Sequence, residues 1–144
     1  MEKIKDISKI KEIAKNIRKG IIESVYSGQS GHPGGSLSIA DIMAVLYFYE
    51  MNIDPKNPQK EDRDRLVLSK GHCAPALYST LANRGFFDTE ELQTLRKIES
   101  RLQGHPDMKK IPGVDMTTGS LGQGLSAANG MAIAGKLEGK DYRV

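Results

Sequence analysis

The sequence predicts an α/β layer fold, in which helices cover a parallel sheet, and three observations support this class. Apolar residues recur every three or four positions over residues 3–26, a spacing typical of an amphipathic helix. A short β-type run, residues 65–69, leads directly into a helical segment. A helix rich in small residues precedes a second strand-like stretch at residues 142–144. Helices that alternate with strands favour an α/β arrangement, of which the sequence shows one complete strand.

Composition places the chain among globular proteins. Of its 144 residues, 38% are hydrophobic and 27% are charged, which fits one domain or part of one. The net charge of +3 is mild, and the lysines of the first helix are expected to form a solvated face, so nucleic acid is not an expected partner. The single cysteine, Cys73, excludes an internal disulfide. No apolar run approaches membrane-spanning length, so we expect a cytoplasmic protein without a membrane partner.

Two capping-box patterns predict further helices. Ser38 with Asp41 opens a segment that runs to Met51, and this segment is apolar around most of its circumference. We therefore expect it to be buried. Asp88 with Glu91 makes a similar pattern and opens the predicted helix TEELQTLRKIES.

Proline and glycine mark two more helices and the long loop between them. Residues 74–85 form the first, with Pro75 in its first turn and Gly85 just past its last turn. Residues 125–138 form the second, whose small side chains permit close packing against a sheet or a helix. The loop at 101–124 holds five glycines and two prolines, and a loop of this length in a compact domain is usually functional or disordered.

The segment TTGSLGQG places glycines 119, 122 and 124 immediately before the last helix. Glycine lets the backbone approach a ligand closely, and the first turn of a helix offers unpaired N–H groups with a positive partial charge. These features indicate a site for an anion or for the polar edge of a ring. The alternative is a tight loop that only leads into the helix.

All three histidines, His32, His72 and His105, follow a glycine, and each falls in a predicted loop. Histidine acts near neutral pH as acid, base or hydrogen-bond donor, so the pattern favours a functional cluster over three ordinary surface residues. A zinc site fits poorly, because no two histidines are close in sequence. Cys73 beside His72 is better explained as a small buried thiol than as a nucleophile.

Four motifs, taken together and in order, resemble the N-terminal thiamine-diphosphate domain of transketolase. They are SGHPGGSLSIADIMAVLYF, DRDRLVLSKGHCAPALYSTLANRG, QGHPD and TTGSLGQGLSAANGMAIAGK. The resemblance runs from about Ile17 to the end and is to the type encoded as a separate N-terminal subunit. It implies that residues 1–144 are the N-terminal portion of the parallel-sheet thiamine-diphosphate-binding (PP) domain, helix-rich in this chain. It also implies transfer of a two-carbon ketol unit from a ketose phosphate to an aldose phosphate, in the pentose phosphate pathway.

The resemblance assigns roles to the histidines and to the glycine loop. It implies that His32 contacts substrate hydroxyls and assists proton transfer, and that His72 lies by the cofactor diphosphate and the reacting carbon. It implies that His105 holds the carbonyl or first hydroxyl of the substrate. The cofactor-binding residues implied are His72, Gly119, Ser120 and Leu121. Gly35, where some members have a serine near the cofactor, is expected to contribute backbone only.

The family holds a divalent metal, Mg²⁺ or Ca²⁺, with a Gly-Asp-Gly motif and a later asparagine, and residues 1–144 contain no Gly-Asp-Gly. We therefore expect a truncated chain with no metal ligand of its own, inactive in isolation. The implied partners are sugar phosphate substrates, the C-terminal subunit of a transketolase, and further copies in a homo-oligomer such as a dimer. Two alternatives stay open: a 1-deoxyxylulose-5-phosphate synthase-like thiamine enzyme, and a non-catalytic chain that only pairs with a partner.

Overall fold

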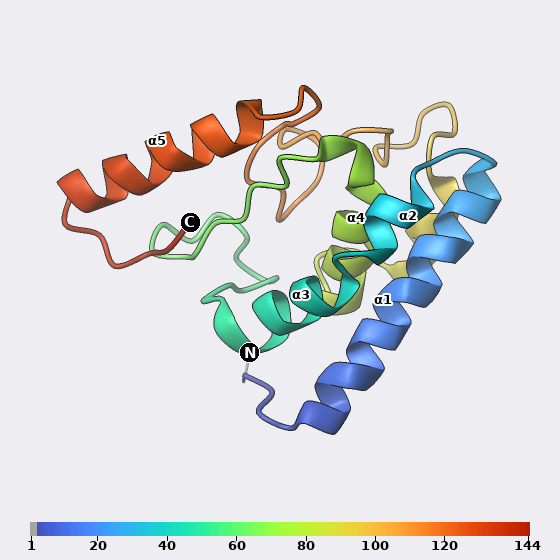
Figure 1. Cartoon of the computed structure of the whole chain (residues 1–144), viewed down its shortest axis with the longest axis horizontal. Coiled ribbons are helices and arrows are strands. Elements are labelled where there is room, and N and C mark those ends of the chain that lie inside the picture. Colours follow the sequence, from blue (N-terminus) through green and yellow to red (C-terminus); the bar gives the residue numbers. More distant parts are fainter. Residues whose placement is uncertain (1–2) are drawn as a thin grey trace.

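The structure is a computed structural model that describes residues 3–144, and it consists of helices joined by long loops (Figure 1). Helix α1 forms one side of the molecule, and α5 stands apart on the other (Figure 1). The elements in chain order are α1 (Ile7–Gly28), α2 (Pro33–Leu37), α3 (Ala40–Val45), the π-helical turn η1 (Leu46–Glu50), the 3₁₀ turn η2 (Gly71–Cys73), α4 (Ala74–Arg84), the 3₁₀ segment η3 (Thr89–Thr94) and α5 (Gln123–Leu137).

Helix α1 confirms the helix predicted from the apolar periodicity, with a later start. Asp6 is its N-cap, and a side-chain oxygen of Asp6 accepts a hydrogen bond from the Ser8 N–H at 2.8 Å. The helix ends at Gly28, because Gln29 adopts the left-handed conformation at φ 47°. The apolar stripe faces the core through buried side chains, including Ala14, Ile17 and Ile21.

The helix predicted to start at Ser38 is α3, which continues directly into η1. The capping box is wrong: the Ser38 hydroxyl donates to the Gly35 carbonyl at 2.9 Å, and no side chain caps α3. The expected burial holds for one face of the segment but not for the opposite face. Met43 and Tyr47 are buried, but Ile42 is 58% exposed on the opposite face.

Helix α4 is the centre of the core, and its predicted boundaries are confirmed. Pro75 lies in its first turn, and Gly85 ends it in the left-handed region at φ 95°. The helix packs against α1, α3 and η3. The Ser79 hydroxyl donates to the Ile17 carbonyl of α1 at 2.9 Å, and Gly20 faces Ser79 with no room for a Cβ. The small residue therefore permits the close approach of the two helices.

The helix predicted after Asp88 is only the 3₁₀ segment η3. The Asp88 side chain forms no cap. Glu91, the expected partner in the capping box, instead forms a two-point ion pair with Arg101 at 2.7 and 2.8 Å. Arg96 and Glu99 have positive φ angles of 59° and 69°, which turn the chain out of any helical path.

The parallel sheet is not confirmed, because residues 3–144 contain no strand. Residues 65–69 run without helix, and one backbone hydrogen bond, from the Arg65 N–H to the Arg143 carbonyl, joins this segment to the end of the chain at 2.9 Å. The next amide, of Leu66, donates to a side-chain oxygen of Asp115 at 2.8 Å. A side chain thus takes the place that a neighbouring strand would occupy in a ladder.

Helix α5 confirms the small-residue helix but not its expected close packing. Only Gly124 and Gly135 are buried among its residues, and both lie near its ends. Leu125, Ile133 and Leu137 are 61%, 60% and 83% exposed. None of the helices described is long and apolar enough to cross a membrane.

Candidate active site

Four loops from distant parts of the sequence meet around the start of α4 and the start of α5. They are the loop before and through α2, the turn 69–73, the loop around residue 105 and the glycine loop 118–122. Each carries one of the motifs in which glycine and histidine are concentrated. The contacts between these four loops define the geometry of the site.

His32 and His72 form an edge-to-face pair. Their ring centroids are 5.0 Å apart, and the ring planes make an angle of 70°. His32 immediately precedes α2 and is exposed, whereas His72 lies within η2 and is half-buried. Two histidines 40 positions apart in the sequence are therefore neighbours in the fold.

The turn that carries His72 packs directly on the glycine loop. A Cβ at Gly71 would lie 2.6 Å from the carbonyl group of Thr118, so only glycine permits this approach. The Thr118 hydroxyl donates to the Leu68 carbonyl at 2.8 Å. These contacts place the glycine loop next to the turn at 69–73.

His105 lies on the other part of the same glycine loop. A Cβ at Gly119 would lie 3.4 Å from Cδ2 of His105, so the imidazole faces the loop backbone. The carbonyl of His105 accepts a hydrogen bond from the hydroxyl of Tyr78, in α4, at 3.0 Å. The side chain of His105 is exposed. The glycine loop therefore contacts His105 directly and packs on the turn that carries His72, and His72 in turn contacts His32.

The glycine loop presents bare backbone at the start of α5. Gly122 occupies the N-cap position with φ 88° and has no side chain with which to cap the helix. Ser120 and Leu121 are exposed. Ser69 satisfies one amide of the first turn, because its hydroxyl accepts a hydrogen bond from the Leu125 N–H at 3.2 Å. A helix start with a glycine N-cap suits an anionic group, so the residues fit a diphosphate.

Cys73 is buried beside the histidine pair, as predicted. A Cβ at Gly35 would lie 2.5 Å from its sulfur, so α2 packs tightly on the thiol. Burial raises the pKa of the Cys73 thiol, while the charge of Lys70 and the hydroxyl of Ser36 act in the opposite direction. A buried, protonated thiol is a poor nucleophile, and Cys73 therefore serves packing.

Sequence reasoning missed three residues at this site: Lys70, Tyr78 and Arg96. Lys70 donates to α2, and Tyr78 holds the backbone of the loop around residue 105. Arg96 donates from Nη1 to the Ser30 hydroxyl at 2.9 Å, and its guanidinium lies beside Gly104. The position of Lys70, directly before the Gly71-His72 pair, could have indicated its role. Arg96 contacts Ser30, which adjoins a Gly-His pair, and Gly104, which belongs to another, but its own position in the sequence gives no such indication.

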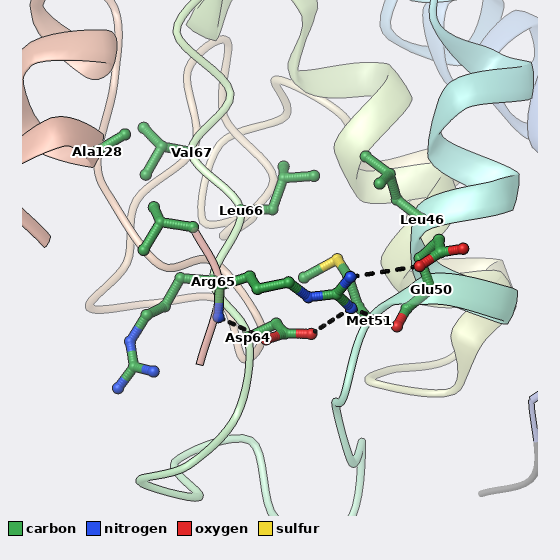
Figure 2. Close-up of a pocket in the computed structure, with 10 residues that line it drawn as sticks. Leu46, Glu50, Met51, Asp64, Arg65, Leu66, Val67 and Ala128 are labelled. Atoms are coloured by element: carbon green, nitrogen blue, oxygen red, sulfur yellow. Dashed lines mark hydrogen bonds and ion pairs between the residues drawn. The ribbon is translucent and has the colours of Figure 1, made fainter. Parts of the chain in front are cut away.

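A separate hollow of about 470 Å³ lies between η1, the segment 64–67 and α5 (Figure 2). Arg143 spans one side of it, with nitrogens 3.1 Å from Asp64 and 3.3 Å from Glu50. No histidine lines it. Within residues 3–144, no group of three or more histidine, cysteine, aspartate or glutamate side chains is arranged to hold a metal ion.

These features define a class: a ligand-binding domain whose site is made of loop backbone, a helix start and clustered histidines. Residues 9–143 match the family described as transketolase, thiamine diphosphate binding domain. The chain belongs to this family.

Relatives with assigned names agree with this membership. The chain is 54% identical over 122 residues to the 6-deoxy-6-sulfo-D-fructose transketolase subunit SqwG of Clostridium sp. (strain MSTE9), covering 85% of this chain and 44% of the relative. It is 45% identical over 126 residues to one of the subunits of the apulose-4-phosphate transketolase of Phocaeicola vulgatus, covering 88% and 44%. It is 48% identical over 136 residues to human transketolase, covering 94% and 22%.

Solved structures show the same fold. Transketolase from Leishmania mexicana superimposes with a TM-score of 0.84 at 40% identity, over 87% of this chain and 19% of that one. Transketolase from Campylobacter jejuni gives a TM-score of 0.83 at 40% identity, over 91% and 21%. The chain therefore spans less than half the length of the relatives that it matches.

Proposed function

We propose that this chain supplies cofactor-binding and substrate-binding residues to a transketolase, which moves a two-carbon ketol unit from a ketose phosphate to an aldose phosphate. The observation that carries this proposal is a chain of contacts: His105 lies against the glycine loop 118–122, Gly71 packs on the same loop, and the adjacent His72 pairs with His32. In this proposal, residues 1–144 form the N-terminal portion of the thiamine-diphosphate domain.

The glycine loop is the proposed diphosphate site. The backbone N–H groups of Gly119, Ser120 and Leu121 lie before a helix start whose N-cap is a glycine, where the positive end of the helix dipole favours an anion. His72 reaches the same place through the contact of Gly71 with Thr118. Thiamine diphosphate, when bound, supplies the carbon centre that accepts the two-carbon unit. A divalent cation, Mg²⁺ or Ca²⁺, is proposed to offset the diphosphate charge.

His32 and His105 are the proposed substrate contacts. Both side chains are exposed; His32 contacts the ring of His72, and His105 lies against Gly119 of the glycine loop. An imidazole exchanges protons near neutral pH and also donates hydrogen bonds, so it suits both the hydroxyls and the carbonyl of a sugar phosphate. The His32 ring touches that of His72, so a proton held at His32 is close to the proposed reacting centre.

The names of two relatives support a two-chain enzyme. Both are called transketolase subunits, and this chain covers 44% of each. We therefore propose that the partner is the C-terminal subunit of a transketolase and that assembly into a dimer completes the active site. We also propose that the enzyme acts in the cytoplasm and belongs to the pentose phosphate pathway.

Calorimetric titration with thiamine diphosphate and Mg²⁺ tests the cofactor site, with residues 1–144 placed in a complete transketolase that supplies the metal-binding Gly-Asp-Gly motif. His72→Ala is expected to weaken binding by about tenfold, because one charge-assisted contact to the diphosphate is lost. Asn57→Ala, in the loop between η1 and η2, is the control and should leave the affinity unchanged. Wild-type protein that binds no cofactor, or equal affinity for the two variants, would contradict the proposed site.

Adding a C-terminal transketolase subunit tests the whole reaction. We expect the mixture to transfer a ketol unit from xylulose 5-phosphate to ribose 5-phosphate, and neither chain to do so alone. His32→Ala and His105→Ala should lower turnover more than cofactor affinity. Activity that is insensitive to both substitutions would show that these histidines do not contact the substrate.

A further inference from the structure

We propose that Lys70 is a positioning residue that fixes His32 against His72. Its Nζ donates to the Gly35 carbonyl at 2.7 Å and to the Ser38 hydroxyl at 3.0 Å. These contacts join the turn that carries His72 to the helix that directly follows His32. The proposal rests on the proposed function only where cofactor affinity is measured.

The acceptors of Lys70 lie at the end of α2. This helix ends at Leu37, so the Gly35 carbonyl is among the last carbonyls of a helix, which have no partner in the next turn. A cationic side chain at a helix C-terminus satisfies such carbonyls and interacts favourably with the helix dipole. The Ser38 hydroxyl also donates to the Gly35 carbonyl at 2.9 Å, so the ammonium, the hydroxyl and the carbonyl form a closed triangle.

The triangle is one of several contacts that join α2, and His32 before it, to the turn at 69–73. A second is the backbone of Gly35 against the sulfur of Cys73. A third is the pair of rings of His32 and His72, 5.0 Å apart at the opposite end of α2. A helix of one and a half turns held at both ends and in the middle cannot rotate on its neighbour. Releasing its C-terminal end removes the restraint that sets the direction of His32.

The charge of the Lys70 ammonium and its hydrogen bond to the Gly35 carbonyl explain why a lysine is needed at this position. The ammonium is half-buried, and its charge also acts on the buried thiol of Cys73. A neutral side chain of the same length would fill the space but leave the Gly35 carbonyl with the Ser38 hydroxyl as its remaining donor and no cation beside it. The expected consequence is a displaced α2 and a changed ring contact, in addition to a loss of stability.

The test compares Lys70→Met, Lys70→Arg and Ser79→Ala in the full chain, with Lys15→Met as a surface control. Ser79→Ala removes a buried hydroxyl between α1 and α4, so it lowers stability without touching the histidine loops. Proton–carbon correlation spectra of the imidazoles report the environment of His32 and His72, and cross-relaxation between their ring protons reports the 5.0 Å contact.

We expect Lys70→Met to shift both imidazole signals and to weaken the ring-to-ring cross-relaxation, with Lys70→Arg largely restoring both. Ser79→Ala and Lys15→Met should leave them unchanged. In the cofactor titration, Lys70→Met should raise the dissociation constant by about tenfold, which is 1.4 kcal/mol. If Lys70→Met does not fold, Ser38→Ala removes the hydroxyl alone and should give the same shifts at smaller size.

Two outcomes would overturn the inference. In one, Lys70→Met behaves as Ser79→Ala does, with lower stability and unchanged histidine signals, which means that Lys70 is only structural. In the other, Lys70→Arg fails to restore the signals. A wild-type chain that binds no cofactor would count against the proposed function alone, because the imidazole spectra are recorded without ligand and still decide the role of Lys70.

Discussion

The hydroxyl of Tyr78 lies 3.0 Å from the carbonyl oxygen of His105. It also lies 2.8 Å from the carbonyl oxygen of Gln103, so one phenol from the buried face of α4 holds two carbonyls of the third histidine loop. The position of an exposed imidazole is thereby tied to the most buried helix of the fold. Core packing and the candidate site are linked through this side chain.

Replacing Tyr78 should therefore cost stability, whereas replacing Tyr47 should not. Tyr78→Phe removes a hydroxyl shared by two carbonyls, and we expect a loss of about 1–2 kcal/mol in the free energy of unfolding. The buried hydroxyl of Tyr47 has no hydrogen-bond partner within residues 3–144, so Tyr47→Phe should be neutral or stabilising. Urea denaturation of both variants measures the difference. Equal destabilisation would contradict the assigned contacts.

Two glycines should respond to alanine in opposite ways. A Cβ at Gly71 would meet the backbone of Thr118 at 2.6 Å, so Gly71→Ala must displace the glycine loop. We expect a loss of about 1–3 kcal/mol together with weaker cofactor binding. Gly130 lies within α5 with open space at its Cα, and Gly130→Ala should gain about 0.5–1 kcal/mol for the helix. Denaturant midpoints and circular dichroism report both changes.

Asp64 should make the folded state more sensitive to acid. Burial alone would raise the pKa of Asp64, but hydrogen bonds from Arg143 and Asn52 outweigh it and hold the pKa below the usual value of 3.8. The stabilisation is present above that usual value and is lost as pH falls through the lowered pKa. Asp64→Asn should thus reduce stability at neutral pH, with the difference from wild type shrinking in acid. Asp62→Asn is the surface control, and a difference independent of pH would contradict the assignment.

Asp115 should show the opposite pH slope. Burial raises the pKa of Asp115, although the Leu66 N–H and the charge of Arg63, 2.7 Å away, oppose the shift. Its protonated form therefore favours folding, and that contribution is lost as pH rises through the raised pKa. Relative to Asp115→Asn, the wild type should lose stability from acid towards neutral pH. Parallel pH titrations of the Asn variants at the two positions check the signs, and slopes of the same sign would refute the prediction.

The parts of the site that sequence predicted are those whose chemistry is local. A glycine before a histidine, or an uncapped glycine loop before a helix, needs no distant partner to be recognised, and the loops lie where those patterns placed them. Proline and glycine likewise marked both ends of α4 correctly. Membership of the family followed from motifs in order, and the match over residues 9–143 confirms it.

The features that sequence did not predict depend on competition between partners. The Ser38 hydroxyl could either cap α3 or donate to the Gly35 carbonyl. The contact with Lys70, 32 positions away, favours the bond to Gly35. The Glu91 carboxylate could either complete a capping box with Asp88 or form an ion pair with Arg101, and it forms the ion pair. The expected strand at 65–69 needs a neighbour, and the Leu66 amide is taken by Asp115. Such outcomes are decided by distant residues that no local pattern contains.

Helix α5 is held where Gly124 lies against Ser69 and Gly135 against Tyr142, and where the Tyr142 hydroxyl donates to the Met131 carbonyl at 3.3 Å. Among its residues, Gly124 and Gly135 alone are buried. An unsupported helix of this length is only marginally stable in water. Its amide protons should therefore exchange with solvent through local opening, while those of α4 await unfolding of the whole core. The proposed diphosphate loop is continuous with the first turn of α5. Binding of an anion to the loop would therefore be coupled to the ordering of α5. The free-energy cost of ordering α5 would then lower the affinity of the proposed diphosphate site at Gly119.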